Sequence, residues 1–312
     1  MSRILIIDPL TLLGREALAL LHRDQSGISA ISYLHTAEDD EHQIAELGGE
    51  PALVPPLESA DDMAGFDGVL VASDDETPRV AHVADFLESS QSAPVVIMGS
   101  RSRIHELTVP ATGPAPTWPS VHVHAAHPAL VALQWTVDCL RHLAEPRNAT
   151  VAAVDPVSVR GSNAVEGLAR QAANRLQGAH VEETIGGHVL AFTAVATDND
   201  DLNRDAAALM PDVSVSATRI VAGFFHGHVA HIGLVFGDEV AEHDVLDSLR
   251  DDERFADPDL TISLDAATDS DRLTLSLPRL SADGRTLAIT AMADGLRVGG
   301  ALTALQILRS MI

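Results

Sequence analysis

The sequence contains no lysine, so each of its 20 basic residues is an arginine, and these face 45 acidic residues. The formal net charge is therefore -25. A field of this sign repels nucleic acid and anionic membrane surfaces, which excludes both as binding partners. The acidic residues form short patches in both halves, such as 39–41 and 251–253, and this distribution is typical of a solvated acidic surface.

Cysteine and long apolar runs are also scarce. Cys139 is the only cysteine, which excludes an internal disulfide and favours a reducing compartment. The first apolar run, Ile4–Ile7, is too short for a signal peptide, and no later run approaches the length of a membrane span. We therefore expect a soluble, cytoplasmic protein.

Length and residue patterning predict two domains, because 312 residues exceed what one hydrophobic core usually organises. The first part alternates short aliphatic runs with helical spacing, which indicates a doubly wound parallel sheet. The strands are expected at 4–7, 68–72 and 94–98, and the helices at 14–22 and 80–89. The segment with Pro110, Pro114, Pro116 and Pro119 is expected to be irregular and to cross between the domains.

The second part has a different pattern, which predicts an antiparallel or mixed sheet with helices on one face. The last segment is expected to form a helix that returns to the first domain. The predicted strands are 213–221, 231–236, 273–277 and 286–291, and the predicted helices are 128–143, 164–176 and 299–311.

Four segments, in order along the chain, resemble the aspartate-semialdehyde dehydrogenase family. Residues 293–306 look like the family's A-D-N-x-R-K-G-A-A-x-N-A-x-Q, and residues 213–228 are similar to its strand I-S-A-T-x-x-R-x-P-V-F-x-G-H. Residues 127–134 fall on N-P-N-C-T-T-I-Q. Residues 161–171 look more like a cysteine-less, catalytically degenerate sister group than like the active enzymes.

The resemblance implies an α/β fold with two domains. Residues 1–127 and 297–312 would form a Rossmann-like, NAD(P)-binding-like doubly wound domain. Residues 128–296 would form an α+β dimerisation domain of the semialdehyde dehydrogenase type. The resemblance also implies a homodimer as the assembly.

The catalytic positions that the resemblance implies are largely altered. The family reduces an acyl phosphate with NADPH through a cysteine thioester, but Leu130 occupies the nucleophile position and cannot attack an acyl carbon. His228 falls on the catalytic histidine and retains that base position. Val221 replaces the arginine that binds the substrate carboxylate, Arg219 two residues earlier is the candidate substitute, and Gly161 falls on the orienting amide.

The cofactor-binding positions are altered as well. Asp8–Gly14 stands where the family has G-A-T-G-x-V-G, so Asp8 is expected to place negative charge in the phosphate position. Thr11, Gly14, Gly299 and Gln306 are the matching cofactor positions that remain. We therefore expect no cofactor, or NADP if the family function is retained. Candidates for anion binding are Ser100, Arg101 and Arg103.

Histidines near one another in the sequence raise the alternative of a metal site. His226 and His228 share one face of a strand while His231 points to the other, and His122, His124 and His127 lie elsewhere, so we predict no metal. The favoured function is a non-catalytic, homodimeric paralogue with a structural, regulatory or ligand-sensing role. Two alternatives stay open: an NAD(P)-dependent oxidoreductase with cysteine-independent chemistry, and a partner that forms mixed dimers with a true dehydrogenase.

Overall fold

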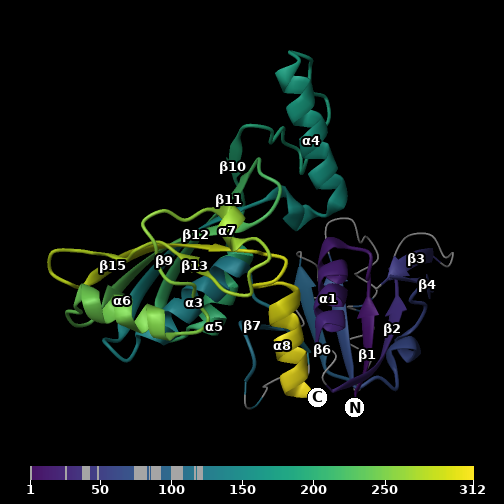
Figure 1. The fold of residues 1–312 in the computed structure, drawn as a ribbon, viewed down its shortest axis with the longest axis horizontal. Coiled ribbons are helices and arrows are strands. Elements are labelled where there is room, and N and C mark those ends of the chain that lie inside the picture. The colour runs from purple at the N-terminus through teal and green to yellow at the C-terminus, as the bar shows by residue number, and fades with distance from the viewer. Residues whose placement is uncertain are drawn as a thin grey trace. The chain divides into compact units, whose positions relative to one another are not determined.

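The computed structural model forms two compact units (Figure 1). The first comprises Met1–Ala126, Val159–Asn163 and Gly299–Ile312, and the second comprises His127–Ser158 and Ala164–Val298. The structure describes residues 2–24, 27–36, 43–47, 49–73, 83, 85, 93–99, 108–115, 117 and 122–312.

The first unit contains a six-stranded sheet in the order β2-β1-β5-β6-β8-β7, and each neighbouring pair is parallel. The central strands are buried aliphatic runs, as predicted, because helices and loops cover both faces of a parallel sheet. A hairpin, β3 and β4, lies beside it. The strands are β1 (Ser2–Ile7), β2 (Ile28–Leu34), β3 (Gln43–Leu47), β4 (Glu50–Val54), β5 (Gly68–Ser73), β6 (Val95–Gly99), β7 (Val109–Ala111) and β8 (His122–Ala125).

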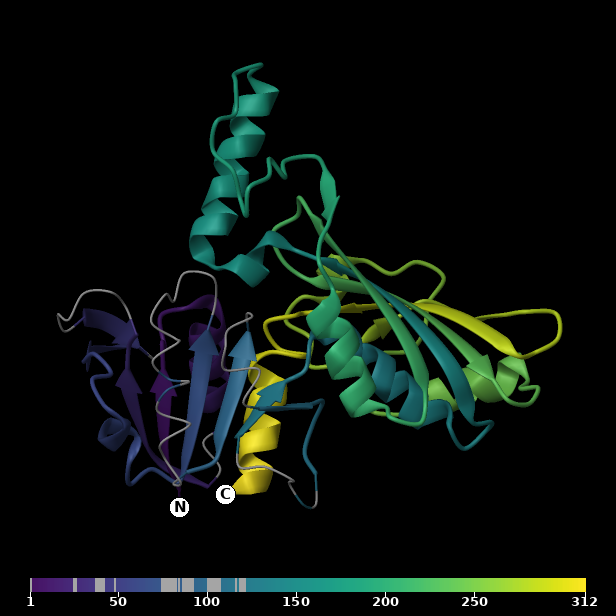
Figure 2. The same ribbon diagram turned by 180° about the vertical axis from the view of Figure 1, so that it is seen from behind.

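Two helices from opposite ends of the chain pack on this sheet. Helix α1 (Leu12–Arg23) follows β1, and the C-terminal helix α8 (Ala301–Met311) packs against α1, β5, β6 and β8 (Figure 2). A single turn of 3-10 helix spans Ala60–Met63. Most of the helix expected at 80–89 lies outside the described residues.

One expectation for this unit is wrong. Pro110 was expected to lie in irregular chain, but it is the central residue of β7. Strand β7 is at the edge of the sheet, where a proline costs little because its missing N–H would not pair with another strand.

The second unit contains a mixed sheet, as predicted, in the order β10-β11-β9-β12-β15-β13 with β14 paired to β15. Strand β9 is parallel to β11 and antiparallel to β12, so it lies inside the sheet. The strands are β9 (Pro146–Asp155), β10 (Ala194–Ala196), β11 (Ser214–Ala222), β12 (His228–Phe236), β13 (Thr274–Leu275), β14 (Arg279–Leu280) and β15 (Thr286–Ala293).

Helix α3 (Pro128–Leu140) packs across β9 and β12, between α5 (Asp200–Leu209) and α6 (Glu242–Asp251). Alternate residues of β9 are buried, including Ala149, Val151, Ala153 and Asp155, as period-2 geometry requires of a strand with one covered face. A short 3-10 helix (Val157–Arg160) follows β9, and α7 (Leu264–Ala267) packs against β15.

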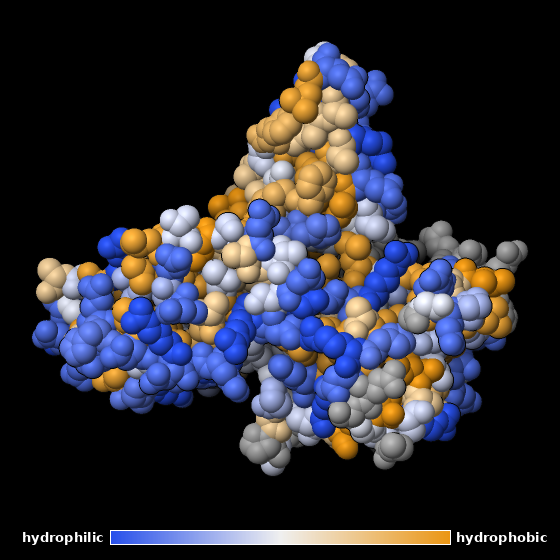
Figure 3. Space-filling model, in the orientation of Figure 1, coloured by the Kyte–Doolittle hydropathy of each residue, from blue (hydrophilic) through white to orange (hydrophobic). Residues whose placement is uncertain are grey.

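Helix α4 (Ser162–Leu176) begins an arm that continues to β10. Its inner face packs on a small apolar cluster that includes Leu168, Ile185 and Leu190. The arm also carries apolar surface (Figure 3), to which Leu176 and Phe192 contribute, at 79% and 65% exposed. Among the described residues, no helix is long and apolar enough to span a membrane.

Candidate functional site

The position that the resemblance assigns to a nucleophile, residue 130, lies in the first turn of α3. His127 caps this helix, Pro128 occupies its first position, and Leu130 is completely buried. Proline is favoured at that first position because its missing N–H would have no partner inside the helix. The side chain at 130 is therefore part of the hydrophobic core, with neither the chemistry nor the exposure of a nucleophile.

A buried carboxylate, Asp155 at the end of β9, gathers three side chains around it. His127 Nε2 lies 3.1 Å from Asp155 Oδ1, and His228 Nδ1 lies 3.2 Å from the same oxygen. Arg219 Nε donates to Asp155 Oδ2 at 2.8 Å. We call these four residues the Asp155 cluster. They come from the start of α3, the end of β9, the middle of β11 and the start of β12, all within the second unit.

The hydrogen bonds indicate which nitrogen of each imidazole donates to Asp155. His127 Nδ1 accepts a hydrogen bond from the backbone N–H of Ala129 at 3.2 Å, so the proton of the neutral ring is on Nε2 and points to Asp155. His228 donates from Nδ1 to the same carboxylate, which leaves its Nε2 as an acceptor. The two rings meet edge to face, with centroids 5.3 Å apart.

Burial and charge set the ionisation of the cluster. Burial lowers the pKa of His127, and the Asp155 carboxylate offsets this only in part. Burial on its own would raise the pKa of Asp155, but the interactions with His127 and His228 outweigh it and the pKa lies well below its usual range. Near neutral pH, Asp155 is therefore ionised while His127 is neutral, and Arg219 supplies the compensating positive charge.

Three positions that the resemblance assigned to substrate binding or orientation have other surroundings in the structure. Arg219 already pairs with Asp155 and, at 3.5 Å, with Asp201, so its charge is compensated inside the protein. Val221 is buried in the apolar cluster beneath α4. Gly161, expected at the orienting position, has a left-handed backbone (φ 101°) and belongs to the first unit, while the side chain that contacts His228 is Asp155.

Gly295 gives the His228 ring its space. A Cβ atom at Gly295 would lie 1.8 Å from His228 Cδ2 and 2.4 Å from Nε2, so any other residue here would displace the imidazole. The resemblance places an asparagine at this position in the family. The observed position of the His228 ring therefore requires glycine at 295.

The turn that would meet a dinucleotide is closed by its own hydrogen bonds. The buried Asp8 carboxylate accepts from the backbone N–H and the hydroxyl of Thr36, at 2.6 and 2.7 Å, after β2. Thr11 caps α1 by accepting from Gly14 N at 3.0 Å. Gly14 is needed because a Cβ there would lie 2.5 Å from the carbonyl oxygen of Asp8. Asp8 is thus directed to Thr36, although its charge remains at the turn.

The remaining predicted positions do not form a second cluster. Gly299 precedes α8 with φ 75°, and its N–H donates to Thr303 at 2.9 Å, while Gln306 is half-buried on α8. The anion candidates Ser100, Arg101 and Arg103 lie outside the described residues.

Of the three histidines that sequence spacing compared, His228 joins the cluster and the other two do not. His226 and His231 are exposed, and His231 contacts Thr290 on the neighbouring strand. His127, Asp155 and His228 instead bring one ligand atom each to within 4.8 Å of one another. Sequence analysis missed Asp155 and the pairing of His127 with His228. The sequence signal that could have revealed the site is Asp155 itself, an acidic residue at a position where the alternating pattern of β9 predicts a buried side chain.

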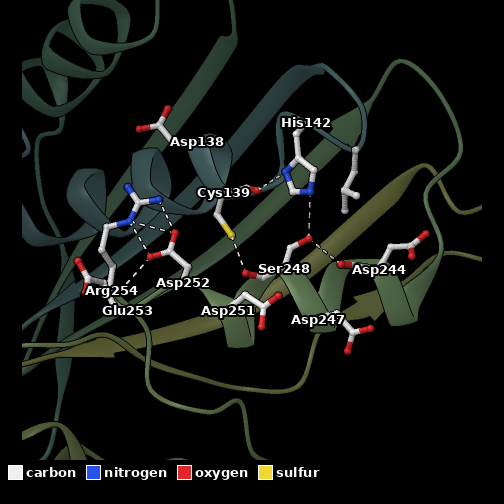
Figure 4. Close-up of a pocket in the computed structure, with 11 residues that line it drawn as sticks. Asp138, Cys139, His142, Asp244, Asp247, Ser248, Asp251, Asp252, Glu253 and Arg254 are labelled. Atoms are coloured by element: carbon white, nitrogen blue, oxygen red, sulfur yellow. Dashed lines mark hydrogen bonds and ion pairs between the residues drawn. The ribbon is translucent and has the colours of Figure 1, made fainter.

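The single thiol lies at the other end of α3, beside an open cavity of about 640 Å³ (Figure 4). Cys139 Sγ donates to the carbonyl of Ser248 at 3.3 Å. Burial, together with the nearby Asp252 carboxylate, raises the pKa of Cys139 to about 12, so the thiol stays protonated. The cavity repels anions because its wall includes Asp138, Asp244, Asp247, Asp251, Asp252 and Glu253.

Comparison with known proteins rests on structure. No family model and no curated protein matches the sequence. Aspartate semialdehyde dehydrogenase II from Vibrio cholerae, complexed with ASA, is similar over 100% of this chain and 98% of its own, with 15% identity and a TM-score of 0.83. A probable aspartate-semialdehyde dehydrogenase from Pseudomonas aeruginosa is similar over 97% of this chain and 96% of its own, with 17% identity and a TM-score of 0.82.

The aspartate semialdehyde dehydrogenase from Francisella tularensis gives 11% identity and a TM-score of 0.75, with 99% of both chains covered. Similarity at this level of identity establishes a shared architecture and leaves the chemistry open. It extends over both units, as the four sequence segments implied. This chain therefore has the fold of the aspartate-semialdehyde dehydrogenases.

Proposed function

We propose that this protein is a homodimeric paralogue of the aspartate-semialdehyde dehydrogenases that does not carry out their thioester chemistry and has a structural, regulatory or ligand-sensing role in the cytoplasm. The observation that carries this proposal is the complete burial of Leu130 at the nucleophile position. Cys139 does not replace it, because it lies nine positions after Leu130 in α3, about 13 Å along the helix axis.

A direct assay tests the loss of chemistry. The purified protein should not catalyse phosphate-dependent oxidation of aspartate semialdehyde, because no thiolate is available to form the thioester. A preparation from a host that lacks its own dehydrogenase removes contaminating activity. Turnover above the no-enzyme rate would contradict the proposal.

The open face of the second sheet supports homodimer formation. Apart from Arg147 at the beginning of β9, the half-buried and exposed residues of β9, β12 and β15 include no acid and no arginine, in a chain of net charge -25. Depletion of charge is typical of the core of an interface, and two identical faces can pack by a twofold axis. These residues are Asn148, Thr150, Ala152, Val154, Val229, His231, Gly233, Val235, Thr286, Ala288, Thr290 and Met292.

Mass measurement by light scattering tests this assembly. We expect a dimer at micromolar concentration in moderate salt, and His231→Glu together with Thr290→Glu should produce monomers because two carboxylates would enter the interface. The control pair Arg250→Glu and Asp257→Arg changes charge on an exposed ion pair elsewhere. A monomeric wild type would contradict the homodimer.

A second candidate function is an NAD(P)-dependent oxidoreductase with cysteine-independent chemistry. The bond between His228 and Asp155 favours it, since an aspartate that fixes a histidine tautomer leaves the other ring nitrogen able to accept a proton. Fluorescence titration with NADPH and NADH separates the two functions. Micromolar binding would favour the oxidoreductase, and absence of binding would favour the paralogue.

A regulatory role could also take the form of a mixed dimer, in which this protein pairs with a catalytically active dehydrogenase. The exposed Leu176 and Phe192 on the arm of the second unit give apolar surface that such a partner could cover. Size-exclusion chromatography of the two proteins together, compared with each alone, tests this assembly.

A further inference from the structure

We propose that His127, Asp155 and His228 form a binding site for one divalent transition-metal ion, and that Zn²⁺ fits their donor atoms. The three residues offer two imidazole nitrogens and one carboxylate oxygen. Zinc sites use these ligands, with water or another ligand completing the coordination. The inference goes beyond the proposed function, because a non-catalytic paralogue and an oxidoreductase could both carry such a site.

The spacing of the donor atoms supports the site. Two ligands at Zn²⁺ bond lengths of 2.0–2.1 Å lie about 3.3–3.4 Å apart when the coordination is tetrahedral. Asp155 Oδ1 is 3.1 Å from His127 Nε2 and 3.2 Å from His228 Nδ1, so these pairs need to separate by only a few tenths of an ångström. The two ring nitrogens also lie within 4.8 Å of each other, close enough for small side-chain rotations to bring both to one ion.

The surroundings hold the ligands in place. Arg219 donates to Asp155 Oδ2, while Oδ1 is the oxygen that lies close to both imidazoles. Such bonds behind a ligating carboxylate orient it toward a metal. His127 Nε2 is also 3.2 Å from Oδ2, so it contacts both oxygens. The positive charge of Arg219 opposes a second cation, and Asp201, at 3.5 Å from its guanidinium, reduces that opposition. The His127 side chain is 12% exposed and gives an ion a route from solvent, whereas Asp155 is 1% exposed.

In the structure, the same atoms form hydrogen bonds to Asp155. A bound metal ion must therefore replace these hydrogen bonds with metal–ligand bonds. In the structure the ring protons on His127 Nε2 and His228 Nδ1 point to Asp155. A metal bound at these nitrogens moves each proton to the opposite ring nitrogen. On His127 that nitrogen accepts from Ala129 N–H, so this cap of α3 is lost on binding. The exchange gives the site a spectroscopic signature that ordinary histidine packing does not have.

Isothermal titration calorimetry tests the site, with Zn²⁺ added to protein from which a chelator has removed any bound metal. We expect one ion per chain at micromolar affinity or tighter. His127→Asn, Asp155→Asn and His228→Gln should each weaken binding at least tenfold. His231→Gln, an exposed histidine on the same strand as His228, should bind as the wild type does. No binding at millimolar Zn²⁺, or a single site unaffected by the three substitutions, would overturn the proposal.

A second measurement uses only the wild-type chain and so does not depend on whether the variants fold. Two-bond ¹H–¹⁵N spectra report which nitrogen of each imidazole carries the proton. On addition of Zn²⁺, one histidine should change from the Nε2–H to the Nδ1–H form and one from Nδ1–H to Nε2–H. Absorption of the Co²⁺ form in the visible region should indicate four-coordination with nitrogen and oxygen ligands. Binding without a tautomer change would place the ion at other histidines and overturn the assignment.

Discussion

Both ends of α3 lie beside carboxylates and histidines, but these groups are buried and charge-balanced at one end and line an open acidic cavity at the other. At the N-terminal end, Asp155 lies among His127, His228 and Arg219 and is 1% exposed. At the C-terminal end, Cys139 and His142 lie beside an open cavity whose wall is mainly acidic. One carboxylate shared by three partners forms a closed, charge-balanced group, whereas many carboxylates around one thiol suppress its ionisation.

This difference teaches that placement determines reactivity more than residue type does. A search for a nucleophile would select Cys139, yet burial and Asp252 raise its pKa to about 12. A search for catalytic acids would pass over Asp155, which has become the centre of the most connected polar group around α3. Each prediction below tests one side of that contrast.

The largest expected effect follows from removing the shared carboxylate. Asp155→Asn should lower the free energy of unfolding by about 3–5 kcal/mol, because it leaves Arg219 buried with its main counter-charge removed. Urea unfolding in the presence of a chelator measures this without a contribution from bound metal. The matched variant Asp201→Asn removes the more distant carboxylate and should cost less than about 1 kcal/mol. If both variants lost the same free energy of unfolding, Asp155 would not be the main counter-charge of Arg219.

The thiol end provides the next effect, in reactivity. At pH 8 the alkylation of Cys139 by iodoacetamide should be roughly a thousandfold slower than that of an exposed thiol, because a pKa of about 12 leaves little thiolate. The rate should rise about tenfold per pH unit up to at least pH 11, whereas an ordinary thiol levels off near its pKa of about 8.5. Mass spectrometry measures the modification, and unfolded protein in urea is the control. A plateau below pH 9 would show that the acidic surroundings do not control the thiol.

A smaller effect is expected when the His228 ring is displaced. Gly295→Ala should cost about 1–3 kcal/mol, because the new Cβ overlaps the imidazole and forces it away from Asp155. Gly113→Ala is the control, since a Cβ there meets nothing within 4 Å. Thermal unfolding compares the two variants. A stability equal to that of wild type would mean that the ring moves freely and that Asp155 does not hold it.

The smallest effect is expected for restoration of the nucleophile alone. Leu130→Cys should give no turnover of aspartate semialdehyde and no acylation burst, since position 130 is buried and neither Gly161 nor Val221 can orient or bind the substrate. Cys139→Ser added to this variant ensures that any labelled thiol is the new one. Slow acylation would indicate that the N-terminal end of α3 is better organised for chemistry than its residues suggest.

Much of the fold could be predicted from local patterns. The run Ile4–Ile7 predicted β1, and apolar spacing predicted α3 and α8 to within a few residues, because burial imposes a period that the sequence records. Strand β7 was missed because Pro110 argues against a strand unless the strand is known to be at an edge. Strand β9 was not predicted at all, because Arg147 and Asn148 interrupt the alternation at its beginning and its three alanines are not typical of strands.

The candidate site could be predicted only in part. The resemblance singled out Leu130 and His228, which lie in the first turn of α3 and at the start of β12. The roles that it implies for them stay predictions. Their neighbours could not be found this way, because His127, Asp155 and His228 approach one another only when β9 and β12 pair in the observed register. A ligand set built across strands depends on sheet order, and no short-range spacing in the sequence encodes that order.

The wide sequence separation within the Asp155 cluster has a kinetic consequence. Its bonds join residues that are 28, 64 and 73 positions apart. Closing such loops costs chain entropy before any bond forms, so the cluster should assemble late on the folding pathway, after the central strands have paired. Substitutions at Asp155 should then accelerate unfolding much more than they slow refolding. The polar centre of the second unit would in that case determine how long the folded state lasts and have little influence on how fast it is reached.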